Sequence, residues 1–98
     1  MVNKLFVIYT TTAFHCKWCS KLKDLLRVYG YDYYEKDLIE PKNKEEFVDQ
    51  GFRTVPQVFI EEKYIGGYES TRDYLRMHFF ENHPNKDHII QELKELDV

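Results

Sequence analysis

The sequence predicts an α/β fold in which a four-stranded mixed sheet has helices on both faces and a further helix follows at the C-terminal end. The main observation is that segments with strand-like and helix-like patterns of apolar residues follow one another along the chain. Their order indicates strand, helix, strand, helix, two strands and a helix. The second is length, since 98 residues suit one compact domain. The third is composition, because 43% hydrophobic and 16% aromatic residues can build a modest core. We therefore expect a single domain over residues 1–98, with its core in 1–82 and a helical extension in 84–98.

The first third of the chain predicts a strand, a helix and a second strand. Residues Lys4–Tyr9 are rich in aromatic and β-branched side chains, which favours a buried strand. A helix is expected over Cys16–Tyr29 and should stop at Gly30, and Tyr31–Asp37 should form the next strand. Helical spacing is seen in Leu22, Leu25, Leu26 and Tyr29. Such a βαβ unit requires its two strands to run parallel.

A second helix and a β-hairpin are expected next. Pro41 suits the first turn of a helix that runs to about Gln50. Two short apolar runs, Gln57–Ile60 and Lys63–Ile65, should then pair as antiparallel strands around a tight charged turn at Glu61 and Glu62.

The last part of the chain predicts two more helices. Ser70–Asp73 resembles a capping arrangement that would open a helix through about Phe80, with Leu75 and Phe79 facing inward. Pro84 interrupts the pattern, and Asp87 can cap a final helix. One apolar stripe of that helix would hold Ile89, Ile90, Leu93 and Leu96. This stripe would pack on the domain or on a partner.

Charge and hydropathy exclude several classes of function. A formal net charge of -3 argues against general nucleic-acid binding, which draws its affinity from many Lys and Arg contacts to phosphates. The longest early apolar run, Leu5–Tyr9, is too short to cross a membrane and lacks the form of a signal peptide, so we expect a cytoplasmic protein with no membrane partner. Thiols are kept reduced in that compartment, which favours a redox or metal-binding role for the two cysteines over a structural one.

The two cysteines lie three residues apart at the start of a predicted helix. Residues at this spacing are neighbours, so Cys16 and Cys19 can form a disulfide. Cys16 should be exposed in the first turn while Cys19 points inward, which makes Cys16 the nucleophile and Cys19 the resolving thiol. The helix start and Lys17 would lower the pKa of the Cys16 thiol toward neutrality. Trp18 would shield the site, contact a partner or pack against the helix.

Three segments in order, CKWC, TVPQVFI and IGGYES, resemble those of glutaredoxins. The resemblance covers residues 1 to about 82 and implies a thioredoxin-like fold, dithiol–disulfide oxidoreductase activity and glutathione as reductant or co-substrate. It also implies a cis Pro56, main-chain pairing of Val55 with glutathione's cysteinyl segment, and capture of the γ-glutamyl carboxylate by N–H groups of Tyr68 and Glu69. The implied catalytic residues are Cys16 and Cys19. The implied glutathione site comprises Lys17, Trp18, Thr54, Val55, Pro56, Gly67, Tyr68, Glu69 and Ser70.

The sequence departs from the family's pattern near the cysteines. Lys17 and Trp18 stand where the family usually has Pro and Tyr, and Ala13 stands where many members have a lysine that binds glutathione. Glu69 and Ser70 replace a frequent acidic pair. Substitute cationic anchors would be Lys42, Lys44 or Arg53, and each is also an ordinary surface charge.

Other functions stay open at the sequence level. A thioredoxin-like electron donor would be reduced by a flavoprotein reductase, an iron–sulfur module would use the exposed thiolate as a ligand, and an idle adaptor would use the C-terminal stripe. A zinc site from Cys16, Cys19, His78 and His83 is disfavoured because Cys19 and His78 are separated by more chain than in a compact finger, so we expect no metal. The family implies glutathionylated proteins and ribonucleotide reductase as substrates of a monomeric enzyme.

Overall fold

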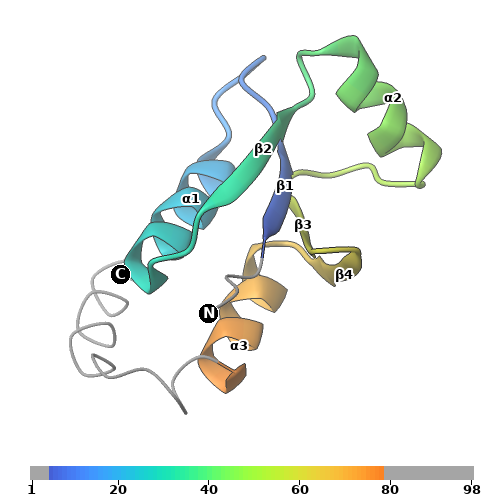
Figure 1. The fold of residues 1–98 in the computed structure, drawn as a ribbon. Helices are drawn as coiled ribbons and strands as arrows, with labels where there is room; N and C mark the ends of the chain where they lie inside the picture. Colours follow the sequence, from blue (N-terminus) through green and yellow to red (C-terminus); the bar gives the residue numbers. More distant parts are fainter. Residues whose placement is uncertain (1–4, 79–98) are drawn as a thin grey trace.

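One mixed sheet and three helices make up residues 5–78, the part of the chain that the computed structural model describes (Figure 1). The order of strands across the sheet is β2-β1-β3-β4. The elements are β1 (Phe6–Thr10), α1 (Lys17–Tyr29), β2 (Tyr33–Asp37), α2 (Pro41–Asp49), β3 (Gln57–Ile60), β4 (Lys63–Gly66) and α3 (Tyr68–His78). This is the fold class that the sequence predicts.

The strand β1 is central and pairs with both halves of the domain. It runs parallel to β2 and antiparallel to β3, and β3 and β4 form an antiparallel hairpin. Phe6, for example, has Tyr33 as its partner on one side and Ile60 on the other. The predicted βαβ unit and the predicted hairpin are therefore both confirmed.

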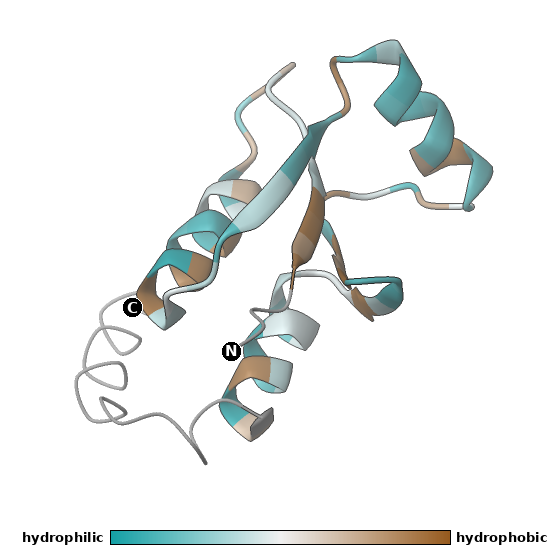
Figure 2. Ribbon diagram, viewed as in Figure 1, coloured by the Kyte–Doolittle hydropathy of each residue, from teal (hydrophilic) through white to brown (hydrophobic). Residues whose placement is uncertain are grey.

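The core lies between the sheet and helices α1 and α3. Because side chains alternate along a strand, Phe6 and Ile8 face this layer while Tyr9 faces α2, where its ring lies 5.8 Å from that of Phe47. Figure 2 shows hydrophobic residues on β1 and β3 and mainly hydrophilic ones on β2 and α2. The buried cluster contains Phe6, Ile8, Leu22, Leu25, Leu26, Val28, Tyr29, Val58, Ile60, Tyr68 and Leu75.

The second strand begins later than the spacing predicts, at Tyr33 rather than Tyr31. Tyr31 instead helps to end α1, since its N–H donates to the Leu26 carbonyl at 3.0 Å and the Gly30 N–H donates to the Arg27 carbonyl at 3.0 Å. Gly30 has a φ of 81°, a conformation that favours glycine and is typical of this helix end. The predicted stop at Gly30 is confirmed.

The third helix begins earlier than predicted. The Gly67 carbonyl accepts hydrogen bonds from the Thr71 N–H at 3.1 Å and the Thr71 hydroxyl at 2.8 Å, so α3 starts at Tyr68. Ser70 therefore lies inside the first turn, and the predicted capping role of Ser70–Asp73 is wrong. Leu75 is buried, as predicted. Phe79 and the predicted final helix lie outside the described residues.

Candidate active site

The two sulfurs are bonded to each other at the start of α1. Cys16 is the N-cap residue, with extended φ and ψ of -109° and 96°, and its Sγ accepts a hydrogen bond from the Cys19 N–H at 3.3 Å. The Cys16–Cys19 disulfide joins Cα atoms that lie 5.3 Å apart. Cys19 is only 3% exposed whereas Cys16 is partly exposed, so the predicted inequality between the two sulfurs is present.

A network around Asp37 anchors the loop that leads from β1 to Cys16. The Asp37 carboxylate accepts hydrogen bonds from the Thr12 N–H at 3.1 Å, the Thr12 hydroxyl at 2.6 Å and the Ile39 N–H at 3.1 Å. Burial raises the pKa of Asp37, but these donors and the charge of Lys23 together outweigh it and leave the pKa below its usual value. Asp37 is therefore a carboxylate at neutral pH and holds the loop from the end of β2.

Helix α1 is also tied to β2 by an ion pair. Lys23 forms an ion pair with Glu35, and the buried Thr10 hydroxyl donates to the same carboxylate. Glu35 of β2 therefore contacts both Lys23 of α1 and Thr10 of β1. This arrangement fixes the position of the helix that carries both cysteines.

A second set of contacts holds α2 against the other face of the sheet. Lys36 donates to Glu46 at 2.7 Å, and the Tyr9 hydroxyl donates to the same carboxylate at 3.2 Å. The hydrogen bond from Lys36 lowers the pKa of Glu46, and the same bond raises the pKa of Lys36. The pair is thus ionised through the neutral range, and the helix is attached by polar contacts as well as by Phe47.

The Trp18 side chain joins the first turn of α1 to the start of α3. Its ring centroid is 5.4 Å from that of Tyr68, and the ammonium groups of Lys17 and Lys21 lie 5.7 Å and 5.0 Å from its centroid. The side chain nevertheless remains 46% exposed. Of the three roles predicted for Trp18, the structure supports packing, since the ring contacts Lys21 of its own helix and Tyr68 of α3.

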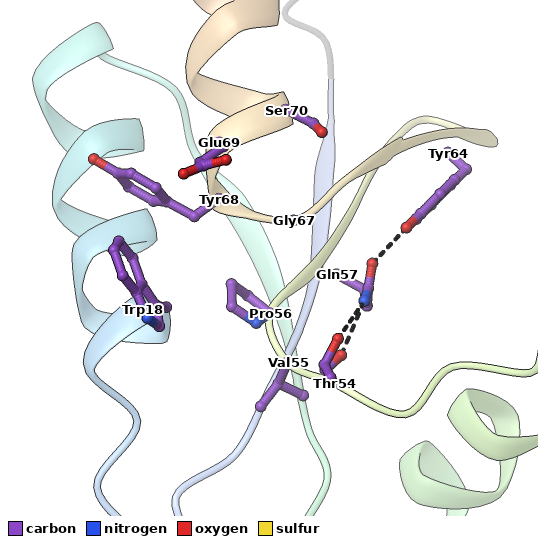
Figure 3. Close-up of a pocket in the computed structure, with 10 residues that line it drawn as sticks. All are labelled: Trp18, Thr54, Val55, Pro56, Gln57, Tyr64, Gly67, Tyr68, Glu69 and Ser70. Atoms are coloured by element: carbon purple, nitrogen blue, oxygen red, sulfur yellow. Dashed lines mark hydrogen bonds between the residues drawn. The ribbon is translucent and has the colours of Figure 1, made fainter.

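A pocket of about 370 Å³ opens beside Trp18 (Figure 3). Its walls come from the first turn of α1, the segment that enters β3, the strand β4 and the first turn of α3. Eight of the nine predicted glutathione-site residues line it, and Lys17 does not. The lining residues are Trp18, Thr54, Val55, Pro56, Gln57, Tyr64, Gly67, Tyr68, Glu69 and Ser70.

Two of the lining residues, Gln57 and Tyr64, were missed by the sequence analysis. The Tyr64 hydroxyl donates to Gln57 Oε1 at 2.6 Å, and Gln57 Nε2 donates to the Thr54 carbonyl at 3.0 Å and its hydroxyl at 3.2 Å (Figure 3). The sequence does contain a signal for Gln57, which is a polar residue at the start of an apolar strand. A buried amide requires hydrogen-bond partners, and in the structure Gln57 is 8% exposed and has them.

The two glycines before α3 have different roles. Gly66 has a φ of 129°, and a Cβ there would lie 2.8 Å from the Ser70 side chain, so only glycine fits. A Cβ on Gly67 would lie 3.5 Å from the Pro56 carbonyl oxygen, which is an ordinary contact. The Val55–Pro56 peptide bond is cis, as predicted. The start of α3 therefore approaches the Pro56 backbone directly.

Residues 5–78 contain neither a cluster of metal-ligating side chains nor a membrane-spanning helix. Within residues 5–78, no three His, Cys, Asp or Glu side chains gather to form a cation site. The considered zinc ligand His83 lies outside that range. No helix in residues 5–78 combines the length and apolar character needed to span a bilayer.

Comparison with known proteins identifies the family. A profile of the glutaredoxin family matches residues 6–65. Glutaredoxin 1 of Rickettsia conorii is 32% identical over 71 residues, which cover 68% of each chain. Buckwheat glutaredoxin, solved as a complex with glutathione, is 26% identical with a TM-score of 0.61 over 96% of this chain and 80% of its own. The glutaredoxin-like NrdH-redoxin of Escherichia coli, described as having a thioredoxin-like activity profile, is 25% identical with a TM-score of 0.62 over 82% and 96%. With its paired sulfurs at the start of α1, the chain belongs to the glutaredoxin family and is a dithiol–disulfide oxidoreductase.

Proposed function

We propose that the protein uses glutathione as its reductant and binds it in the pocket between Trp18 and the start of α3. The observation that carries the proposal is the composition of that pocket, which gathers Val55, Gly67 and the first turn of α3 beside the α1 start. The N–H groups of a helix start attract anions, so those of Tyr68 and Glu69 would receive the γ-glutamyl carboxylate. Val55 would pair with the cysteinyl main chain.

The proposed cycle assigns a different step to each sulfur. The Cys16 thiolate attacks a substrate disulfide, forms a mixed disulfide and releases one thiol; Cys19 then attacks Cys16 Sγ, which releases the second thiol and closes the Cys16–Cys19 bond. One glutathione thiolate attacks Cys16 Sγ, which breaks the Cys16–Cys19 bond, leaves Cys19 as a thiol and forms a mixed disulfide on Cys16. A second glutathione thiolate attacks the glutathione sulfur of that mixed disulfide, which forms glutathione disulfide and releases the Cys16 thiolate. The Cys19 N–H, which contacts Cys16 Sγ at 3.3 Å, would stabilise the thiolate that each cycle regenerates.

A comparison of electron sources tests the proposal. Reduction of a small disulfide by wild-type protein should depend on glutathione concentration and saturate when glutathione reductase and NADPH regenerate the thiol. The matched reaction replaces glutathione and its reductase with a thioredoxin-type flavoprotein reductase and NADPH. Turnover only in the second reaction would contradict the proposal and assign the protein a thioredoxin-like role.

We further propose that the enzyme acts as a cytoplasmic monomer on glutathionylated proteins and on ribonucleotide reductase. The support is the family's usual activity together with paired cysteines suited to a reducing compartment. Sedimentation of the reduced protein would measure its mass, and a dimer would contradict the proposed monomer. Ribonucleotide reductase turnover with this protein as sole electron donor would test the substrate, and a failure to support turnover would contradict it.

A further inference from the structure

The buried amide of Gln57 lies beside the glutathione pocket and has no role in the proposed cycle. Gln57 is 8% exposed, and its Nε2 donates to the Thr54 carbonyl at 3.0 Å and to the Thr54 hydroxyl at 3.2 Å. A carbonyl oxygen can only accept, so these bonds determine which end of the amide faces Thr54. The other end, Oε1, accepts a hydrogen bond from the Tyr64 hydroxyl at 2.6 Å. Both polar atoms of this side chain are therefore engaged.

This amide bridges the segment that would contact glutathione. Only Val55 and Pro56 lie between Thr54 and Gln57, and all four residues line the pocket (Figure 3). Thr54 and Val55 belong to no helix or strand, and within residues 5–78 no main-chain hydrogen bond of a turn or loop includes either of them. The Gln57 side chain therefore supplies a connection between this segment and β3 that main-chain bonds do not.

Aromatic packing on the sheet face that carries α2 holds the other partner of the amide. Gln57 is the register partner of Tyr9, whose ring faces α2, so Gln57 lies on that face as well. The ring centroid of Tyr64 lies 5.2 Å from that of Phe52 and 5.3 Å from that of Phe59. These contacts restrict the position of the Tyr64 hydroxyl and hence the orientation of the amide to which it donates. The aromatic cluster is thereby joined to the wall of the pocket.

We propose that Gln57 is a positioning residue, which holds the main chain of Thr54 and Val55 in the geometry that the glutathione main chain requires, and that Tyr64 orients it. The inference rests on the proposed function, in which Val55 pairs with the cysteinyl segment. Hydrogen bonds weaken steeply with poor distance or angle, so a loosely held segment aligns the bound disulfide less well. Reduction of a disulfide that has no peptide main chain does not use this contact.

Single-turnover kinetics of the pre-reduced protein test the inference without an electron donor. Glutathione disulfide is compared with hydroxyethyl disulfide, and the ratio of the two second-order rate constants measures recognition of the peptide main chain. Gln57→Leu replaces the amide with an apolar side chain of similar size and should lower this ratio about tenfold. Tyr64→Phe keeps the ring and removes the orienting hydroxyl, so it should lower the ratio about twofold to threefold.

Gln50→Leu is the matched control. The Gln50 amide also donates to one carbonyl, that of Glu46 at 3.1 Å, and to one hydroxyl, that of Tyr9 at 3.3 Å, but Gln50 does not line the pocket. Its loss should leave the ratio unchanged. Nitrogen relaxation of the Val55 amide gives a second readout, since its order parameter should fall from about 0.85 toward about 0.6 in Gln57→Leu and stay constant in Gln50→Leu.

The outcomes separate this inference from the proposed function. A Gln57→Leu ratio within about twofold of wild type, or an equal fall in Gln50→Leu, would overturn the inference alone. An unchanged order parameter of Val55 in Gln57→Leu would also overturn it. Equal rates with both disulfides in wild type, together with no glutathione-dependent turnover, would contradict the proposed function and the inference that rests on it.

Discussion

The starts of helices α1 and α3 flank the same pocket but are chemically different (Figure 3). The first turn of α1 contains no acidic residue, and the Sγ of its N-cap, Cys16, accepts a hydrogen bond from the Cys19 N–H. The first turn of α3 contains Glu69 and is preceded by a glycine pair that allows close approach of another backbone. One helix start therefore carries a sulfur of the protein itself, and the other is where the proposed function places a carboxylate of the ligand.

In the proposed function the two helix starts therefore perform separate tasks. N–H groups without an acceptor inside the helix and a positive dipole end are common to both helix starts. At α1 these groups favour a thiolate within the chain. At α3 they would favour a carboxylate of the ligand. Substitutions at the two helix starts should therefore alter different steps of the reaction.

The largest effect is expected at α1, where Cys16→Ser removes the nucleophile. Disulfide reduction should fall to the background rate with every substrate, since a serine hydroxyl is not ionised at neutral pH. Cys19→Ser is the matched change and should abolish the dithiol reduction of protein disulfides while Cys16 still forms mixed disulfides with glutathione. Mass spectrometry of the trapped adducts distinguishes the two variants. A glutathione adduct on Cys16→Ser that supports turnover would show that the roles have been reversed.

The next effect is expected at α3, where Gly66→Ala introduces a side chain into an unfavourable backbone conformation. Residues forced into such regions cost of order 1–3 kcal/mol, and the contact with Ser70 adds to this, so we expect a loss of about 2–3 kcal/mol of unfolding free energy. Gly67→Ala is the control and should cost less than about 1 kcal/mol. Urea denaturation measures both. Equal losses would mean that the positive φ of Gly66 has no part in stabilising the start of α3.

The α1 start was more predictable from sequence than the α3 start. A Cys-x-x-Cys pair before an apolar helical stripe indicated α1 to within one residue, because the N-cap residue, Cys16, is itself part of that motif. The start of α3 depends on the Gly67 carbonyl, which accepts two bonds from Thr71, and no side-chain pattern reports that backbone contact. Ser70 resembled an N-cap only because Asp73 follows it at the spacing of a capping arrangement.

The active site shows the same division between local pattern and tertiary contact. Residues that belong to recognisable motifs, such as Val55 and Gly67, lie in the pocket as expected. The anchors of Gln57 and Asp37 join residues that are distant in sequence or in different elements, for example Thr12 and Asp37. Which residues form these pairs depends on the order and register of the strands. The partners are not separated by a helical or strand period, so the sequence pattern does not predict their contact.

An intermediate effect is expected from Asp37→Asn, which weakens the loop before α1 and leaves α3 unchanged. Hydrogen bonds to a charged acceptor contribute more than neutral ones, and partial exposure reduces the benefit, so we expect a loss of about 1 kcal/mol. Faster hydrogen exchange of the Thr12 amide should accompany it. Asp32→Asn, an exposed carboxylate after α1, is the control. Unchanged exchange at Thr12 would argue against the anchor.

Asp37 and Glu46 predict how the free energy of unfolding depends on pH. The pKa values of Asp37 and Glu46 are lowered by folding, so their contribution is complete above the unfolded values and is lost as the pH falls through the folded ones. Unfolding free energy should therefore be constant near neutrality and decrease below about pH 4.5. The raised pKa of Lys36 has the opposite sign, with its contribution lost only at strongly alkaline pH. Asp37→Asn should make the free energy of unfolding decrease less steeply below about pH 4.5. The same slope in wild type and variant would contradict the contribution of the Asp37 carboxylate.

The smallest effect is expected from Glu69→Gln, which makes the α3 start resemble the α1 start. The acidic side chain stabilises its helix by about 0.3–1 kcal/mol, but it also lies in the pocket where the γ-glutamyl carboxylate of glutathione is proposed to bind. Its removal should lower stability slightly while lowering the KM for glutathione about twofold to threefold, a change that added salt should reduce. Asp73→Asn is the control, since that side chain is 63% exposed in the same helix and does not line the pocket. A KM that stays constant or rises in Glu69→Gln would place the bound carboxylate away from α3, and the contrast between the two helix starts would then rest on Cys16 alone.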